Sequence, residues 1–205
     1  GYVGLPVALE ATRAGMQVVG LDTSEGVVKK LNEGVSHVDD VSNEEIESML
    51  ESGFKASTDA TCLAHASTIV ICVPTPLSKD FGPNLEAIEE AGRAIAQHLE
   101  NGQMVVLEST SYPGTTEEIL LPLLQVTGLV AGKDFSLAYS PERIDPGNAR
   151  FGFRNTPKVV GGLTKKCMNH AASFYSRIVD EVVISSGIKE AEMTKLLENT
   201  YRHIN

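Results

Sequence analysis

The sequence has few cysteines, no long apolar run and a deficit of positive charge. Its 205 residues include three cysteines, Cys62, Cys72 and Cys167. They do not have the spacing of a zinc site, so we expect no metal. Because their number is odd and they are not clustered, we expect a reducing, cytoplasmic compartment. No apolar run approaches the roughly 18 residues that a membrane-spanning helix needs. The net charge of -10 argues against nucleic acid or an anionic membrane as the main partner.

The composition is that of a folded chain. Apolar residues make up 42% of it and charged residues 21%, and no short repeat or low-complexity segment is present. This length accommodates one large domain, or one domain and part of another.

The first residues predict a dinucleotide-binding turn. Gly1 and Gly4 fit the last two glycines of G-x-G-x-x-G, where the backbone comes close to a pyrophosphate before a helix N-terminus. An apolar run over residues 17–22 ends at Asp22, about 20 residues further on, where such folds place the acid that binds the adenosine ribose. No arginine follows this acid, which favours NAD over NADP. The alternative is a glycine-flanked loop before an ordinary helix. The first glycine and its strand are missing, so we expect either a fragment of a longer protein or a front end that is truncated or disordered.

Strand and helix patterns alternate along the rest of the chain. Strands are predicted at residues 54–57, 68–73, 104–107, 135–139, 157–162 and 181–185, and helices at 24–32, 43–50, 85–99, 117–124, 165–178 and 187–205. This order predicts an α/β fold with a doubly wound parallel sheet, a Rossmann-type domain whose first strand is missing.

Several polar residues follow these strands. Thr75, Thr110 and Glu142 would meet the glycine turn, because the carboxyl ends of parallel strands share one edge. On ordinary expectation, Thr75 lies in a stiff loop, a loop glutamate such as Glu142 is solvated, and a Lys195/Asn199 pair four apart on a helix is a surface feature.

Four motifs in order resemble those of one enzyme family. They are Gly-Tyr-Val-Gly-Leu-Pro (1–6), Cys-Val-Pro-Thr-Pro-Leu (72–77), Glu-Ser-Thr-Ser-Tyr-Pro-Gly-Thr-Thr-Glu-Glu (108–118) and Ser-Pro-Glu-Arg-Ile-Asp-Pro-Gly-Asn (140–148). Over nearly its whole length the chain resembles the UDP-glucose/GDP-mannose dehydrogenase family, the nucleotide-sugar 6-dehydrogenases. The last motif is most similar to the UDP-N-acetylglucosamine 6-dehydrogenase branch, since UDP-glucose members usually carry Pro-Glu-Phe-Leu there.

The resemblance implies two successive NAD-dependent oxidations of a sugar C6 alcohol to the acid, for surface polysaccharide precursors. The implied substrate is UDP-N-acetylglucosamine. The alternatives are a UDP-N-acetylmannosamine or UDP-glucose 6-dehydrogenase, a related β-hydroxyacid dehydrogenase, or a nucleotide-binding module without chemistry.

By the same resemblance, Glu142 is the acid/base, Thr110 holds a catalytic water, and Lys195 and Asn199 stabilise the oxyanion. Contacts to the sugar come from Glu142, Arg143, Ile144, Asp145, Pro146, Lys195 and Asn199. Contacts to NAD come from Gly1, Tyr2, Val3, Gly4, Asp22, Val73, Pro74, Thr75, Ser109 and Thr110. Val27 stands where the family often has a basic residue, which puts one adenosine-side contact in doubt.

The expected domains are residues 1–186, which bind NAD, and residues 187–205, the start of a central linker and dimerisation helix. The catalytic cysteine and the UDP-binding domain are expected beyond residue 205, so none of the three cysteines is assigned a role. This chain alone is expected to be inactive, and the full-length protein to be a homodimer.

Overall fold

The strands form two sheets. The computed structural model describes residues 2–76, 82–143 and 152–204, without the side chains of Asn199, Arg202 and His203. The first sheet pairs β1 (Val19–Leu21) with β2 (Lys55–Ser57) in parallel. The second has the order β3 (Thr68–Ile71), β4 (Met104–Leu107), β5 (Ser136–Tyr139), β6 (Lys158–Gly162) and β7 (Val182–Ile184).

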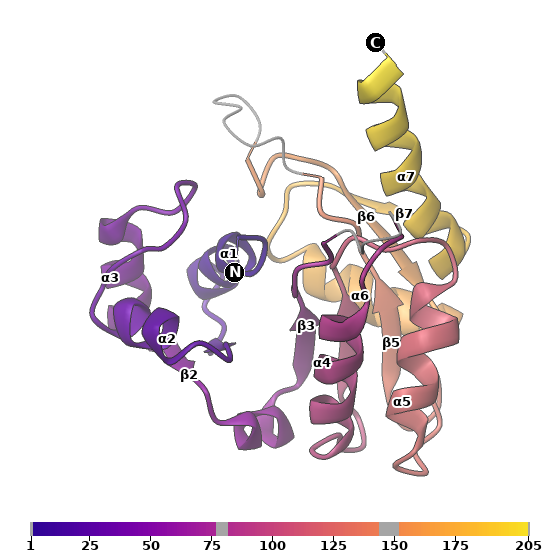
Figure 1. Cartoon of the computed structure of the whole chain (residues 1–205), viewed down its shortest axis with the longest axis horizontal. Helices are drawn as coiled ribbons and strands as arrows, with labels where there is room; N and C mark the ends of the chain where they lie inside the picture. The colour runs from indigo at the N-terminus through magenta and orange to yellow at the C-terminus, as the bar shows by residue number, and fades with distance from the viewer. Residues whose placement is uncertain (1, 77–81, 144–151, 205) are drawn as a thin grey trace.

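Helices cover both faces of the five-stranded sheet (Figure 1). On one face α1 (Gly4–Arg13) and α6 (Lys165–Tyr175) pack against β4, β5 and β6. The other face is covered by apolar residues of four elements. These are α4 (Glu86–Ala96), the π-helical turn (Thr116–Leu120), α5 (Leu121–Gln125) and the first residues of α7 (Ile188–Ile204). A short 3₁₀ helix (Ala60–His65) leads into β3.

Helix α1 joins the two sheets. Its Val7 and Ala11 belong to the core of the large sheet, whereas Leu5 and Leu9 belong to a core shared with α2 (Glu25–Asn32), α3 (Asn43–Glu51) and β2. The predicted capping box at the start of α3 is present, with Ser42 as the capping residue. The placement of α1 fixes the β1–β2 lobe relative to the rest of the molecule (Figure 1).

The predicted α/β class is confirmed, but the sheet is not wholly parallel. Strands β3, β4 and β5 run in parallel, whereas β6 is antiparallel to β5, and β7 follows the direction of β6. A parallel return needs a crossover, usually a helix, over one face of the sheet. The described residues between β5 and β6 form no helix, so the chain turns back beside β5.

This reversal sets a register at the sheet edge. Tyr139 pairs with Gly161, and in an antiparallel ladder each step forward on one strand is a step back on the other. Continuing the register past the end of β5 brings Glu142 opposite Lys158. The start of β6 therefore lies at the edge where β3, β4 and β5 end.

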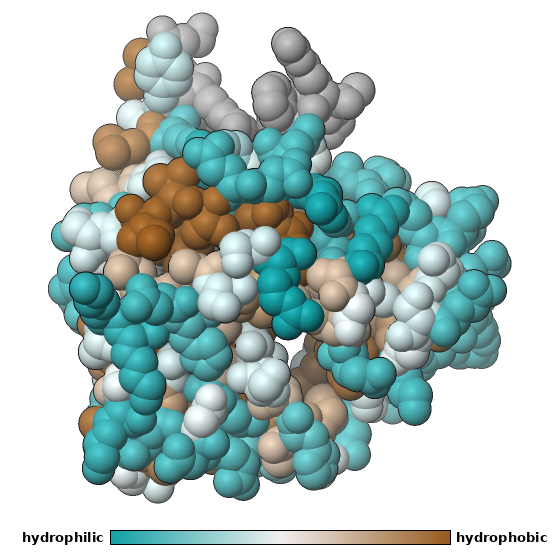
Figure 2. All heavy atoms as spheres, turned by 180° about the vertical axis from the view of Figure 1, so that it is seen from behind, coloured by the Kyte–Doolittle hydropathy of each residue, from teal (hydrophilic) through white to brown (hydrophobic). Residues whose placement is uncertain are grey.

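The outer surface near the C-terminal end is apolar. The exposed large hydrophobic residues of β7 and α7 are Val183, Ile184, Met193, Leu196, Leu197, Tyr201 and Ile204. Figure 2 shows a hydrophobic patch on the back of the molecule. None of the helices that the structure describes is long and apolar enough to cross a membrane. The homodimer implied by the resemblance stays a prediction.

Gly161 allows α7 to pack closely on β6. A Cβ at this position would lie 2.3 Å from the carbonyl oxygen of Gly187 and 2.9 Å from Cβ of Ala191. We expect Gly161→Ala to lower the free energy of unfolding by about 1–3 kcal/mol, because the backbone before α7 must move. Gly152→Ala is the matched control, since nothing lies within 4 Å of its added Cβ. Urea unfolding of both variants measures the difference, and equal midpoints would contradict this packing.

Candidate active site

The predicted site residues that the structure describes follow strands ending at one edge of the fold, precede α1, or lie on the helices α1 and α7. Asp22 follows β1, Thr75 follows β3, Thr110 follows β4 and Glu142 follows β5. Helix α1 begins at the same edge, which we call the rim. In open α/β sheets this is the edge where ligands bind.

The N-terminus of α1 fits an anionic group. The residue before the helix, Val3, makes no side-chain capping bond, and the first turn has no acidic residue. Pro6 has no N–H, so the amides of Gly4 and Leu5 are the donors that the first turn offers. A Cβ on Gly4 would lie 3.3 Å from Cβ of Cys72, so a larger residue would displace the turn from β3. These features suit the pyrophosphate of a dinucleotide.

The ends of β1, β3 and β4 supply the other predicted cofactor contacts. The carboxylate of Asp22 accepts a hydrogen bond from the amide of Ser24 at 2.9 Å, which orients it at the end of β1. Ser109 donates its hydroxyl hydrogen to the carbonyl of Val73 at 2.7 Å, so this side chain ties two strand ends together. The next residue, Thr110, is exposed at the rim.

Glu142 is buried beside a second carboxylate and one ammonium. Lys158 Nζ lies 2.9 Å from Glu108 Oε2 and 3.7 Å from Glu142 Oε2. The hydroxyl of Tyr175, on α6, donates to the other oxygen of Glu108. The side chains of Lys158, Glu108 and Glu142 are 5%, 0% and 9% exposed, so water screens these charges little. We call Glu108, Glu142, Lys158 and Tyr175 the buried charge cluster.

Burial and charge act in opposite directions on this cluster. Burial raises the pKa of Glu108, which the neighbouring Lys158 ammonium partly offsets. Burial alone would lower the pKa of Lys158, but Glu108 and Glu142 together raise it above its usual range. Lys158 is therefore protonated throughout the neutral range.

Helix α7 is attached to the rim by three side chains spaced three residues apart. Glu192 accepts hydrogen bonds from the amides of Gly114 and Thr116, and from the Thr116 hydroxyl at 2.7 Å. Lys195 Nζ donates to the main-chain carbonyl of Glu142. Residues spaced by three lie on one face of a helix, so this face of α7 meets both the loop after β4 and the loop after β5.

The third attachment is Glu198, which pairs with the guanidinium of Arg143. Arg143 Nε lies 2.8 and 3.0 Å from its two carboxylate oxygens. Arg143 also donates to the carbonyl of Pro157 at 2.8 Å, just before β6. The arginine of the Ser-Pro-Glu-Arg motif thus joins the end of β5, the start of β6 and α7.

Some predicted residues lie outside the described part of the structure. These are Gly1, Ile144, Asp145, Pro146 and the side chain of Asn199. Conversely, the sequence reasoning gave no role to Lys158, Glu108, Tyr175 or Glu192. A charged residue adjoining a buried apolar run was the available signal for the first two, in Lys158-Val-Val and Val-Val-Leu-Glu108.

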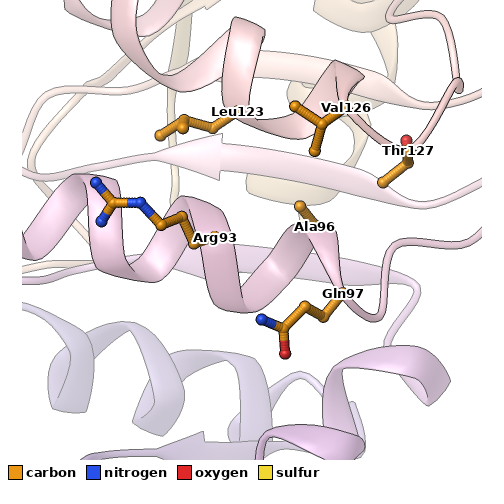
Figure 3. A pocket seen from close by; sticks show the side chains of 6 residues that line it. All are labelled: Arg93, Ala96, Gln97, Leu123, Val126 and Thr127. Atoms are coloured by element: carbon orange, nitrogen blue, oxygen red, sulfur yellow. The ribbon is translucent and has the colours of Figure 1, made fainter.

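A surface groove of about 460 Å³ lies between the C-terminal ends of α4 and α5, away from the rim (Figure 3). Its lining includes Leu123, Val126 and Arg93, and the guanidinium of Arg93 pairs with Glu89 at 2.6 Å. Helices that follow strands of a parallel sheet run back from the ligand-binding edge, so this groove is at the opposite end of the domain.

Comparison with known proteins agrees with the motifs and the fold. Residues 1–179 match the profile of the UDP-glucose/GDP-mannose dehydrogenase family, NAD binding domain. The chain belongs to this family. Its cofactor is accordingly NAD.

Two named relatives from this family differ in their sugar. A UDP-N-acetyl-D-mannosamine dehydrogenase of Pyrococcus horikoshii is 37% identical over 100% of this chain and 49% of the relative. A UDP-N-acetyl-D-glucosamine 6-dehydrogenase of Pseudomonas aeruginosa is 35% identical over 100% of this chain and 48% of the relative. The solved structure of the UDP-D-ManNAc dehydrogenase from Pyrococcus horikoshii superposes with a TM-score of 0.93, at 36% identity, over 98% of this chain and 49% of that one. The chain spans about half the length of these family members.

The contacts of Glu192 predict a stability effect far larger than that of a surface glutamate. Glu192→Ala leaves two buried amides and one hydroxyl of the β4 loop without their acceptor, and we expect a loss of about 1–3 kcal/mol in the free energy of unfolding. Glu90→Ala, on the exposed face of α4, is the control and should change stability by less than about 0.5 kcal/mol. Thermal unfolding of both variants tests this, and similar midpoints would show that α7 does not depend on Glu192.

Proposed function

We propose that this chain is the NAD-binding half of a nucleotide-sugar 6-dehydrogenase, which oxidises the C6 alcohol of a UDP-N-acetylhexosamine to the acid in two steps. The observation that carries the proposal is the position of Glu142. Its carboxylate lies at the rim, where α1 begins, with Lys158 beside it and Lys195 bonded to its main chain.

Each residue then has a role that its surroundings support. Glu142 accepts the proton of the C6 hydroxyl, since a carboxylate at the rim is a general base within reach of a substrate. The Lys195 ammonium stabilises negative charge that develops on the C6 oxygen. Thr110, exposed next to the end of β4, offers its hydroxyl to a water molecule. When bound, NAD accepts the hydride that leaves C6.

The sugar itself is the finer part of the proposal. The Ser-Pro-Glu-Arg motif favours UDP-N-acetylglucosamine, whereas the names of the two relatives divide between N-acetylglucosamine and N-acetylmannosamine. These two sugars differ only in configuration at C2. We therefore rank UDP-N-acetylglucosamine first, its C2 epimer second and UDP-glucose third, and keep the cytoplasmic location as a prediction.

A direct assay of the complete gene product tests the reaction. We expect two NADH formed per sugar, with one of UDP-N-acetylglucosamine, UDP-N-acetylmannosamine and UDP-glucose clearly preferred in kcat/KM. Glu142→Gln should lower kcat by about 100-fold or more, because general-base catalysis contributes about 10²–10⁴-fold. NAD binding without NADH formation from any of the three sugars would instead favour the nucleotide-binding module.

Cofactor binding can be tested without any sugar. Asp22→Ala should raise the Kd for NAD about tenfold, since it removes a charged hydrogen-bond acceptor for the ribose, worth about 1.5 kcal/mol. Glu25→Ala, an exposed glutamate at the start of α2, is the matched control. Fluorescence titration with NAD measures both variants, and an unchanged Kd for Asp22→Ala would overturn its assignment to the ribose.

A further inference from the structure

We infer that Lys158 is a positioning residue for Glu142: Glu108 and Tyr175 fix its ammonium, and that ammonium sets the orientation and the charge of the Glu142 carboxylate. This inference rests on the proposed function, in which Glu142 takes the substrate proton. It concerns residues that touch neither the sugar nor NAD in that proposal.

The geometry gives the ammonium one fixed place. Both oxygens of Glu108 accept hydrogen bonds, one from Lys158 at 2.9 Å and one from the Tyr175 hydroxyl, so Glu108 is a carboxylate held at two points. The ring centroids of Phe153 and Tyr175 lie 4.9 and 5.4 Å from Lys158 Nζ, which adds cation–π attraction on the buried side. From this place Lys158 Nζ is 3.7 Å from Glu142 Oε2.

The cost of burial argues for a functional role. Replacing a buried ion pair by apolar residues is often neutral or stabilising, so such a pair is weak evidence for a role in stability. Here two carboxylates share one buried ammonium, which is a still less favourable arrangement for the fold alone. Groups with strongly shifted pKa values, such as Glu108 and Lys158, occur preferentially at functional sites. The proposed catalytic base, Glu142, lies beside them.

Within residues 2–76, 82–143 and 152–204, the charged and titratable groups near Glu142 come from several neighbouring elements. They are Lys158 on β6, Glu108 after β4, Cys72 after β3, Tyr2 before α1, and Lys195 on α7, which bonds the main chain. Among them Lys158 is a cation 3.7 Å from a Glu142 carboxylate oxygen, and Glu108 is a like charge nearby. Removing Lys158 and removing Glu108 should therefore shift the acidic limb of the pH–rate profile in opposite directions.

The signs follow from the charges. Lys158→Met removes the positive charge and leaves Glu108 facing Glu142, so the acidic limb of the pH–rate profile should move up by about one pH unit or more. Glu108→Gln removes the competing negative charge, so the limb moves to lower pH. Lys158→Arg keeps the charge and should restore the limb to within about half a pH unit of the wild type. If Lys158 had a role in folding alone, the two variants would not shift the acidic limb in opposite directions.

The experiment measures kcat and KM between pH 5 and 9 for the complete gene product and these variants. For Lys158→Met we expect kcat to fall at least tenfold at neutral pH, with the Kd for NAD changed less than about twofold. Lys133→Met is the matched control, because Lys133 is 80% exposed and pairs only loosely with Asp134 at 4.0 Å. An unmoved acidic limb in Lys158→Met, or shifts of the same sign in Lys158→Met and Glu108→Gln, would overturn the inference.

A second readout separates this inference from the proposed function. The side-chain carboxyl carbon of Glu142 can be titrated by NMR in ¹³C-glutamate-labelled protein, with Glu142→Gln to assign the signal. If no nucleotide sugar is oxidised, the proposed function fails, whereas a Glu142 signal that shifts oppositely in Lys158→Met and Glu108→Gln still supports the coupling. If Lys158→Met does not fold, the test is the Glu108→Gln variant. A shift of its acidic limb to lower pH supports the inference, and an unshifted limb overturns it.

Discussion

The reversal of the chain between β5 and β6 is the constraint on which the arrangement of the rim depends. Parallel strands deliver only the residues at their carboxyl ends to the ligand-binding edge. Because β6 runs the other way, its first residue reaches that edge as well, and Lys158 meets Glu142. In a parallel β6 of the same five residues, Lys158 would lie at the far edge, roughly 13 Å away at about 3.3 Å per step over four steps.

Helix α7 depends on the same reversal. Since β7 follows the direction of β6, it ends at the edge opposite the rim, and the helix after it must run back toward the rim (Figure 1). The rise of 1.5 Å per residue carries Glu192, Lys195 and Glu198 past the loops after β4 and β5 in succession. One helix face thus holds loops from two strands, so a displacement of α7 would disturb the β4 loop and the Glu142 carbonyl together.

The sequence predicted the elements well because their signals are local. The capping box at Ser42, the buried apolar runs of β3, β4 and β5, and the acid after β1 each depend on residues close together in the chain. The motifs likewise placed the strand ends that form the rim. The family assignment, supported by the profile match, drew on the same short segments.

The direction of β6 and the partners of Glu142 were not predictable in this way. The residues at 157–162 predict a strand but not its direction, which the structure shows to be antiparallel to β5. Lys158 looked like the polar residue that begins a strand, and Glu108 like one that ends it. Their pairing depends on strand order, register and the tyrosine at the end of α6, which are distant in sequence and meet only in the folded chain.

The two halves of the rim are built on different physical principles. The half proposed to bind the cofactor offers main-chain amides at the start of α1 and a carboxylate oriented by a backbone amide. The other half contains the buried charges of Glu108, Lys158 and Glu142, and beside them the half-buried pair of Arg143 and Glu198. Because a Coulomb interaction between buried groups is strong, a single substitution there changes the electrostatic potential at the Glu142 carboxylate without touching it.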